Sequence, residues 1–325
     1  MSELSGDVTP ALLASAYTLG SVSGWAQAAE GSAGEIFRLV TSEGVFAAKE
    51  FTGEQRPASE DLEWRAGFAS ACRAAGVPSP DTLRTTSGGL LFDHPETGRP
   101  WLVQPWVDGT VPDRTDLAAT VWLAEQAALI HQLAVPCRAG EEVFPFYVQV
   151  DADWAGLAAG AQEAGLEWAG RLADRAAEFA ELTEFVNAAP IGDVVSCHRD
   201  LKTANTLAGA DGSRCLLDWD TAGPQEPWRE LGTLLIHHVR DEAALRAIAG
   251  AYRRAGGPAW PEGAVLFATG LAVWLNFLDG QVSAALDPEA DEDARDFAEF
   301  IAPKLTEDIP GFAMLDAAAG VVAAS

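Results

Sequence analysis

The pattern of apolar and polar residues divides the chain into a β-rich first part and a helical remainder. Residues 35–41 and 45–51 are apolar and rich in β-forming side chains, and the segment 42–44 between them predicts a β-hairpin. Apolar residues then recur at helical spacing over residues 59–75, 117–133, 154–187, 241–255 and 262–278. We therefore expect an α+β protein: a small, mainly β lobe with one helix at residues 1–104 and a larger, mainly helical lobe at residues 105–325.

Lys49 lies inside the second of these strands. Because side chains alternate across a strand, Lys49 shares a face with Ala47, whereas Phe46 and Ala48 lie on the other face. The chain has only three lysines against eighteen arginines, so a lysine among small apolar residues is a candidate for a specific role. The alternative is a strand lysine that extends to water.

Residues 198–218 carry the candidate chemistry. They read His198-Arg199-Asp200-Leu201-Lys202-Thr203-Ala204-Asn205, then a short hairpin, then Leu217-Asp218. The apolar residues before His198 predict a buried strand that delivers Asp200 to a turn, and Asp211-Gly212 is a hairpin signal. The returning strand should bring Asp218 beside Asn205, although they are thirteen positions apart in the sequence.

Asp200, Asn205 and Asp218 form the set of side chains that phosphoryl transfer from a magnesium nucleotide requires. Such transfer needs positioning and neutralisation of charge on the phosphate oxygens more than covalent chemistry. Mg²⁺ prefers oxygen ligands, which Asn205 and Asp218 supply, and Asp200 can orient the acceptor hydroxyl and take its proton. His198 is expected to support the loop from behind. Each residue alone could be structural or solvated, but their spacing together favours a kinase.

The same residues resemble the aminoglycoside phosphotransferase and choline kinase family. The resemblance rests on residues 198–205, on Asp218-Trp219-Asp220 and on the segment up to residue 232, and the similarity of pattern extends over about residues 17 to 280. It implies a bilobal protein-kinase-like fold, ATP or GTP as co-substrate, Mg²⁺ as cofactor, and transfer of the γ-phosphoryl group to a small-molecule hydroxyl. The family roles are catalysis for Asp200 and metal binding for Asn205 and Asp218.

Two departures qualify this resemblance. His198-Arg199-Asp200 also looks like the catalytic loop of a protein kinase, but neither Asp-Phe-Gly nor Ala-Pro-Glu follows, so a peptide acceptor is not expected. Arg199 stands where the antibiotic kinases more usually have glycine, which leaves the subfamily open.

The resemblance also places the rest of a nucleotide site in the first lobe. It makes Lys49 the phosphate-binding lysine, with Ala47 under the adenine and Glu63 on the following helix as the carboxylate partner of Lys49; Glu60 is the alternative. Gln104 and Trp106 are expected to bind the adenine edge through their main chains. The phosphate-covering loop is assigned by position only, within residues 20–25 and 31–34, because neither segment has the Gly-x-Gly-x-x-Gly spacing.

Composition excludes several classes of protein. The formal net charge of -27 repels nucleic acid and favours a cationic small molecule, although acidic surfaces are common without any such ligand. Four cysteines without paired spacing and five histidines make a zinc cluster or a disulfide framework improbable. We expect no secretory signal at Met1–Asp7, no membrane-spanning segment and no membrane partner, and hence a cytoplasmic location.

The acceptor site is expected beyond Asp200, among the late helices. Related kinases of polycationic antibiotics hold amino groups with acidic residues, which makes Asp220, Asp279 and Asp287 candidates, together with Trp274. Residues 287–296 can equally be an exposed helix start, where acidic side chains favour the helix dipole. We expect an antibiotic-inactivating kinase; the alternatives are a housekeeping kinase of an amino sugar or amino alcohol, and a catalytically silent nucleotide-binding protein. The residues leave the oligomeric state open.

Overall fold

The chain forms two compact units in a computed structural model that describes residues 9–31, 34–52 and 57–325. Met1–Asp7, and Ser32 and Ala33 of the expected phosphate-covering loop, lie outside the described residues. The first unit comprises Met1–Arg114 and Thr203–Thr221, and the second comprises Thr115–Lys202 and Ala222–Ser325. This division differs from the expected boundary after residue 104.

Hydrogen bonds explain why residues 203–221 pack with the first unit. The backbone N–H groups of Thr110 and Ala208 donate to each other's carbonyl oxygens at 3.0 and 2.9 Å, and the N–H of Leu216 donates to the carbonyl of Pro78 at 2.7 Å. The second half of the expected catalytic segment therefore extends the small unit, although residues on both sides of it in the sequence belong to the large one.

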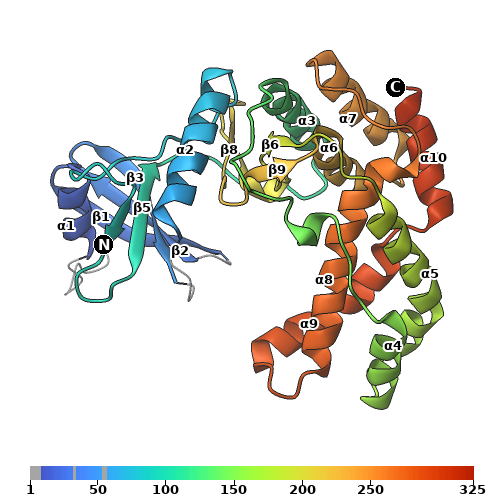
Figure 1. The fold of residues 1–325 in the computed structure, drawn as a ribbon. Helices are drawn as coiled ribbons and strands as arrows, with labels where there is room; N and C mark the ends of the chain where they lie inside the picture. The colour runs from blue at the N-terminus through green and yellow to red at the C-terminus, as the bar shows by residue number, and fades with distance from the viewer. Residues whose placement is uncertain (1–8, 32–33, 53–56) are drawn as a thin grey trace. The chain divides into compact units, whose positions relative to one another are not determined.

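The first unit is built on a five-stranded antiparallel sheet in the order β1-β2-β3-β5-β4 (Figure 1). The expected hairpin is confirmed, and its turn lies at residues 42–43. An additional strand, β1, occupies most of the glycine-rich region that carries no strand pattern in the sequence. The elements of this unit are α1 (Thr9–Ala16), β1 (Val22–Gly31), β2 (Gly34–Thr41), β3 (Gly44–Phe51), α2 (Ser59–Ala74), β4 (Leu91–Asp93), β5 (Pro100–Pro105), η2 (Thr203–Asn205), β7 (Thr206–Ala208) and β8 (Arg214–Leu216).

The two faces of the sheet have different neighbours. Phe46 and Ala48 of β3 pack with Trp101 of β5 and with Leu13 of α1 in one buried cluster. Phe51 lies on the other face of β3 and packs with side chains of β5 and α2. This alternation confirms the expected register of the strand and places Lys49 on the side that faces α2.

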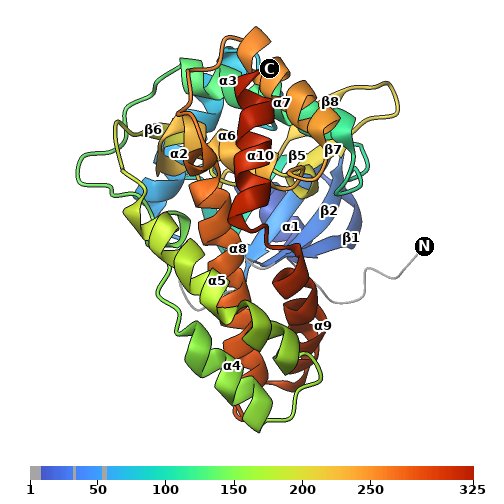
Figure 2. The same ribbon diagram turned by 90° about the vertical axis from the view of Figure 1, so that its right-hand side faces the viewer.

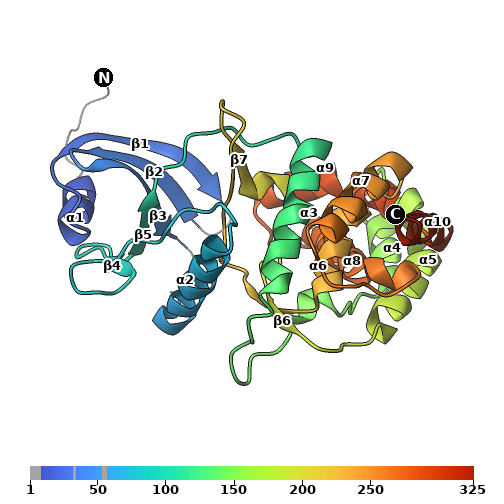
Figure 3. The same ribbon diagram turned by 90° about the horizontal axis from the view of Figure 1, so that it is seen from above.

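The second unit is mainly helical. Helix α8 lies at its centre and packs against α4, α5, α6 and α9 (Figure 2), whereas α3 lies alongside α7 and α6 (Figure 3). The elements are α3 (Leu117–Gln132), η1 (Pro145–Tyr147), α4 (Trp154–Glu163), α5 (Ala169–Ala188), β6 (Val195–Cys197), β9 (Gly223–Gln225), α6 (Pro227–Ile236), α7 (Glu242–Arg254), η3 (Ala264–Phe267), α8 (Ala268–Leu286), α9 (Glu292–Asp308) and α10 (Phe312–Ala323).

Residues 264–286 are a correction to the expectation that no segment is long and apolar enough to cross a membrane. This stretch of 23 residues passes that test by length and composition. Many of its apolar side chains, among them Leu271, Leu275 and Leu278, are fully buried by the helices around α8, whereas Phe277 is exposed. The segment therefore has the features of a core helix. With the sheet of the first unit and the helices of the second, the α+β class expected from the sequence is confirmed.

Candidate active site

The β7–β8 hairpin brings Asn205 and Asp218 together. Thr206 pairs with Leu216 at the open end of the hairpin, and the N–H of Leu217 donates to the carbonyl of Asn205 at 2.8 Å. Asp218 follows directly, with its backbone in the left-handed region (φ 59°), a conformation that aspartate tolerates better than most residues with a Cβ. The sequence gap between the two oxygen-bearing side chains is thus closed by the ladder, as the turn signal predicts.

A cavity of about 570 Å³ lies within the first unit and is lined by both of these residues. We call it the first-unit cavity. Its lining combines apolar side chains of the sheet and of β7 with the charged side chains of Lys49, Arg65, Asp218 and Asp220. Its walls include the following predicted site residues: Ala47, Lys49, Gln104, Trp106, Asn205, Asp218 and Asp220.

Lys49 has a different partner from the one predicted. Its Nζ forms an ion pair with the carboxylate of Asp220, whereas Glu63 accepts hydrogen bonds from Nη1 and Nη2 of Arg84 at 2.8 and 2.7 Å. The hydrogen bond from Arg84 lowers the pKa of Glu63. The structure therefore corrects two expectations: Glu63 does not hold Lys49, and Asp220 lies in the first-unit cavity with Lys49 instead of in an acceptor site.

Trp219 fixes the segment between the two aspartates. Its ring is buried and meets Phe68 of α2 edge to face, with ring centroids 5.6 Å apart. The backbone N–H of Asp220 also donates to Oδ1 of Asp218 at 3.4 Å. Burial of the indole between two acidic residues turns both carboxylates toward the same cavity.

Gln104 and Trp106, which are expected to bind the adenine edge, have some of their polar groups already hydrogen-bonded. The N–H of Trp106 donates to the carbonyl of Val45 at 2.9 Å, so this N–H already has a partner, and the expected main-chain contact with the adenine edge stays a prediction. The side chain of Gln104 donates to Oγ1 of Thr82 at 3.1 Å. Arg65 of α2 also lines the first-unit cavity; the sequence reasoning missed it because arginines are common on exposed helix faces.

Asp200 belongs to the second unit, on the loop that follows β6. Its backbone N–H donates to Nδ1 of the buried His198 at 3.3 Å, which agrees with a supporting role for that histidine. The carboxylate of Asp200 pairs with Lys202 at 2.8 Å. Between His198 and Asp200, Arg199 adopts a left-handed backbone (φ 68°), at the position where glycine is more usual in the resembling family.

A buried chain of polar groups holds this loop, and no local pattern in the sequence predicts it. The hydroxyl of Tyr252 lies 2.7 Å from Nδ1 of His131, and Nε2 of His131 lies 2.6 Å from Oε2 of Glu230. The other carboxylate oxygen of Glu230 accepts the backbone N–H of Arg199. Cys197 lies close enough to make a metal cluster conceivable, but both ring nitrogens of His131 already have partners, so a structural network is the better interpretation.

The family follows from the sequence as a whole. The model of the phosphotransferase enzyme family matches residues 24–266, which is most of the chain. The protein belongs to this family. The predicted resemblance and the prediction of a small-molecule kinase are thereby confirmed.

Solved structures share the fold of this phosphotransferase at low sequence identity. An aminoglycoside phosphotransferase from Alicyclobacillus acidocaldarius has 14% identity and a TM-score of 0.67, over 95% of this chain and 96% of that chain. A spectinomycin phosphotransferase in complex with ADP and spectinomycin has 13% identity and a TM-score of 0.63, over 92% and 98%. A microcompartment-associated aminopropanol kinase has 17% identity and a TM-score of 0.62, over 92% and 95%. The expected protein-kinase-like fold is confirmed.

The remaining acceptor candidates of the phosphotransferase lie in the second unit, at different places. The ring of Trp274, on α8, packs against that of His237, with ring centroids 5.1 Å apart. Asp279, further along α8, has its pKa raised by burial and by the nearby Asp151. Asp287 accepts the N–H of Glu289 at 2.9 Å in the exposed turn after α8, so its side chain stabilises that turn, and residues 292–308 form α9.

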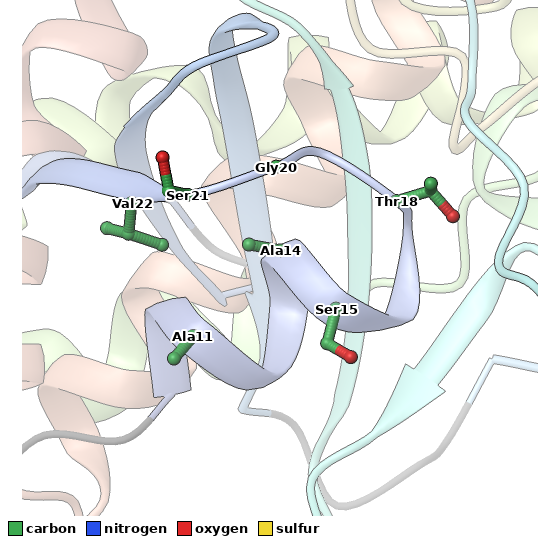
Figure 4. A pocket seen from close by; sticks show the side chains of 7 residues that line it. All are labelled: Ala11, Ala14, Ser15, Thr18, Gly20, Ser21 and Val22. Carbon is green, nitrogen blue, oxygen red and sulfur yellow. The ribbon is translucent and has the colours of Figure 1, made fainter.

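A second, more open hollow lies between α1 and the start of β1 (Figure 4). It has a volume of about 610 Å³ and is lined by no charged side chain, although Gly20, Ser21 and Val22 of the expected phosphate-covering loop are among its walls. Its polar side chains are the hydroxyls of Ser15, Thr18 and Ser21. Because no charged side chain lines it, it lacks a carboxylate for a metal ion and a cation for phosphates, so the first-unit cavity is the better candidate.

Proposed function

We propose that this phosphotransferase moves the γ-phosphoryl group of ATP or GTP to a hydroxyl group of a small, amine-bearing molecule, most plausibly an antibiotic. One observation carries the proposal: Asn205, Asp218 and Lys49 line the same cavity as the residues expected around the adenine, which are Ala47, Gln104 and Trp106. The small apolar side chains of that cavity suit a flat base, and its charged side chains suit phosphates and a metal ion.

The donor atoms fit a hard divalent cation. Asn205 and Asp218 lie at the end of one hairpin and both line the first-unit cavity, and Mg²⁺ binds through a few such oxygen-bearing side chains together with phosphate oxygens and water. When bound, the ion would neutralise charge on the phosphate oxygens. Lys49 would hold a phosphate oxygen directly, and Asp220 would restrain Lys49 until the nucleotide arrives.

In the chemical step, the acceptor hydroxyl oxygen forms a bond to the γ-phosphorus. The bond from that phosphorus to the bridging oxygen breaks, and the nucleoside diphosphate leaves with the electron pair. Asp200 orients the hydroxyl and receives its proton. Asp200 and Asn205 are five positions apart in the sequence, so the chain itself keeps their Cα atoms within about 18 Å of each other.

The acceptor class rests on charge and on the family. The net charge of -27 attracts cations, and the similar structures include a kinase bound to spectinomycin. The similarity to an aminopropanol kinase supports the second candidate, a housekeeping kinase of an amino alcohol or amino sugar. A silent nucleotide-binding protein fits less well, because Lys49, Asp200, Asn205 and Asp218 are all present. A cytoplasmic location would give the enzyme its nucleotide.

A titration of nucleotide with and without Mg²⁺ tests the nucleotide half. We expect Mg²⁺ to tighten binding of ATP or GTP in the natural protein and to have little effect in Asp218→Ala. Asp211→Ala is the matched control, because Asp211 stabilises only the turn of the same hairpin through Ser213. Equal magnesium dependence in both variants would remove Asp218 from its assigned role.

An acceptor panel tests the transfer half. Release of nucleoside diphosphate would be measured with aminoglycosides, peptide antibiotics, amino sugars and amino alcohols. Acceptor-dependent release confined to antibiotics supports the first candidate, and release confined to amino alcohols or amino sugars supports the second. Nucleotide binding without turnover on any acceptor would favour the silent protein.

A further inference from the structure

Three aromatic rings of the second unit form a cluster that is partly open to solvent. The rings of Phe144, Phe146 and Tyr147 lie 5.8 to 6.4 Å apart between centroids. The side chains of Phe144 and Phe146 are 56% and 37% exposed. We call these three residues the aromatic cluster. Large apolar side chains gathered at a surface mark a place where something binds.

The segment that carries the aromatic cluster is held in place from two helices. Nδ2 of Asn276, on α8, donates to the carbonyls of Phe146 and Gln149 at 2.9 and 2.8 Å. The amide of Asn187, on α5, exchanges two hydrogen bonds of 2.9 Å with the backbone of Val150. The exposed rings are therefore presented by a fixed backbone, which lowers the entropy cost of binding to them.

The aromatic cluster is also joined to the loop that carries Asp200. The guanidinium carbon of Arg199 lies 5.4 Å from the ring centroid of Tyr147. Gly223 makes room for this side chain, because a Cβ there would lie 2.7 Å from Nη2 of Arg199. Arg199 holds a left-handed backbone that glycine would adopt more easily. The contact of its side chain with Tyr147 links the aromatic cluster to the residue directly before Asp200.

Two carboxylates lie near the same segment. Asp151 follows Val150 directly, and Asp279 lies one turn beyond Asn276 on α8. Burial, and then the charge of Asp151, raise the pKa of Asp279. Because two like charges disfavour each other, a cation at this place would be stabilised by both. Apolar rings and two carboxylates therefore belong to the same held segment and the helix α8 that holds it, in the unit that carries Asp200.

We propose that the aromatic cluster is the acceptor subsite for an apolar, preferably aromatic, group, and that the acceptor's ammonium group lies near Asp151 and Asp279. This inference rests on the proposed function and narrows its substrate class to amphiphilic amines. An acceptor of this kind places its ring on Phe144 and Phe146 and its hydroxyl near Asp200. Polyhydroxylated aminocyclitols, which have no apolar face of comparable size, leave the cluster uncovered.

Three simple alcohols test the inference. Phenylalaninol carries a ring, an amine and a hydroxyl; alaninol lacks the ring, and phenylpropanol lacks the amine. We expect kcat/KM for phenylalaninol to exceed that of each of the others by about tenfold. Double replacement of Phe144 and Phe146 by alanine should remove the preference over alaninol. Asp151→Asn should reduce the preference over phenylpropanol.

The matched control is the double replacement of Phe297 and Phe300, which are 50% and 60% exposed on α9. It also removes two phenylalanine rings, but from another surface, and it should leave kcat/KM for all three alcohols unchanged. Equal kcat/KM for phenylalaninol and alaninol in the natural protein, or an equal effect of both double variants, overturns the inference.

Binding measurements keep this test separate from the proposed function. Saturation-transfer NMR with the same alcohols reports the ring contact even when none of them is phosphorylated. Loss of the phenylalaninol signal in the Phe144/Phe146 variant alone supports the subsite, and equal signals in that variant and the natural protein overturn it. Failure of magnesium nucleotide to bind would instead contradict the kinase mechanism and leave the ring contact standing.

Discussion

Lys49 illustrates how much one residue depends on its neighbours. The ammonium group sits on a strand face among apolar side chains and is held by Asp220. Lys49→Met keeps the length of the side chain and removes the charge. We expect nucleotide affinity to fall about 10- to 100-fold, the range for a lost hydrogen bond to a charged group. Isothermal titration calorimetry would measure this affinity. The control is Lys304→Met, on α9, which should bind nucleotide with the affinity of the natural protein.

Asp200 should affect turnover and leave binding intact. Asp200→Asn keeps the shape of the side chain but cannot take the hydroxyl proton. We expect kcat to fall about 10²- to 10⁴-fold, the usual contribution of a general base, with nucleotide affinity unchanged by titration calorimetry. Turnover close to that of the natural protein would exclude a role as base.

The residues that the sequence could and could not predict differ in the range of their contacts. Asn205 and Asp218 were predictable, because a local hairpin with an Asp211-Gly212 turn determines their separation. The partner of Lys49 was not, because Glu63 and Asp220 were both suitable carboxylates and only the packed structure pairs Glu63 with Arg84. The buried contact of His131 with Glu230 spans 99 residues of sequence and has no local pattern at all.

At the scale of elements, Tyr252 of α7 tests the buried chain behind the catalytic loop. Tyr252→Phe removes only the hydroxyl that contacts His131 and leaves a buried ring nitrogen without this partner. We expect the free energy of unfolding to fall by about 1–3 kcal/mol, measured by urea denaturation. Because Glu230 still accepts the N–H of Arg199, kcat should fall less than in Glu230→Gln. Equal stability of Tyr252→Phe and the natural protein would contradict this arrangement.

Gly232 determines how closely α6 approaches the segment before α8. A Cβ on Gly232 would lie 1.9 Å from the carbonyl oxygen of Leu266, which is backbone and cannot rotate away. Gly232→Ala should therefore destabilise the protein by about 1–3 kcal/mol or more. Gly280→Ala, within α8, has nothing within 4 Å of the new Cβ and should stabilise by up to about 1 kcal/mol. Thermal unfolding of both variants compares the two effects.

Glycine also explains where the element predictions departed from the structure. The helical pattern at residues 154–187 continues through a break, because Gly165 adopts a left-handed backbone (φ 72°) and α4 ends there. Strand β1 was missed because its sequence is rich in glycine, alanine and serine, and its pairing with β2 alone defines it. Local propensity identified the longer helices, whose apolar periodicity is unbroken.

At the scale of the whole molecule, the net charge of -27 predicts a salt effect that depends on the acceptor. With saturating nucleotide, we expect kcat/KM for phenylalaninol, a cation, to fall severalfold as ionic strength rises from about 0.05 to about 0.5 M, because the Debye length shortens. Phenylpropanol, which has no charge, provides the control and should change little. A parallel decline for both alcohols would point to a general effect of salt on the enzyme.

The interleaving of the two units has a consequence for biosynthesis. The first unit needs Thr203–Thr221 in addition to everything up to Arg114, so its hairpin arrives 107 residues after the rest (221 minus 114). At a synthesis rate of about 5–20 residues per second, the ribosome takes roughly 5–20 s to supply it. During that interval the sheet of the nascent first unit lacks the hairpin that completes its cavity wall. Its apolar surface is then exposed, and a chaperone that binds apolar surface would bind it there.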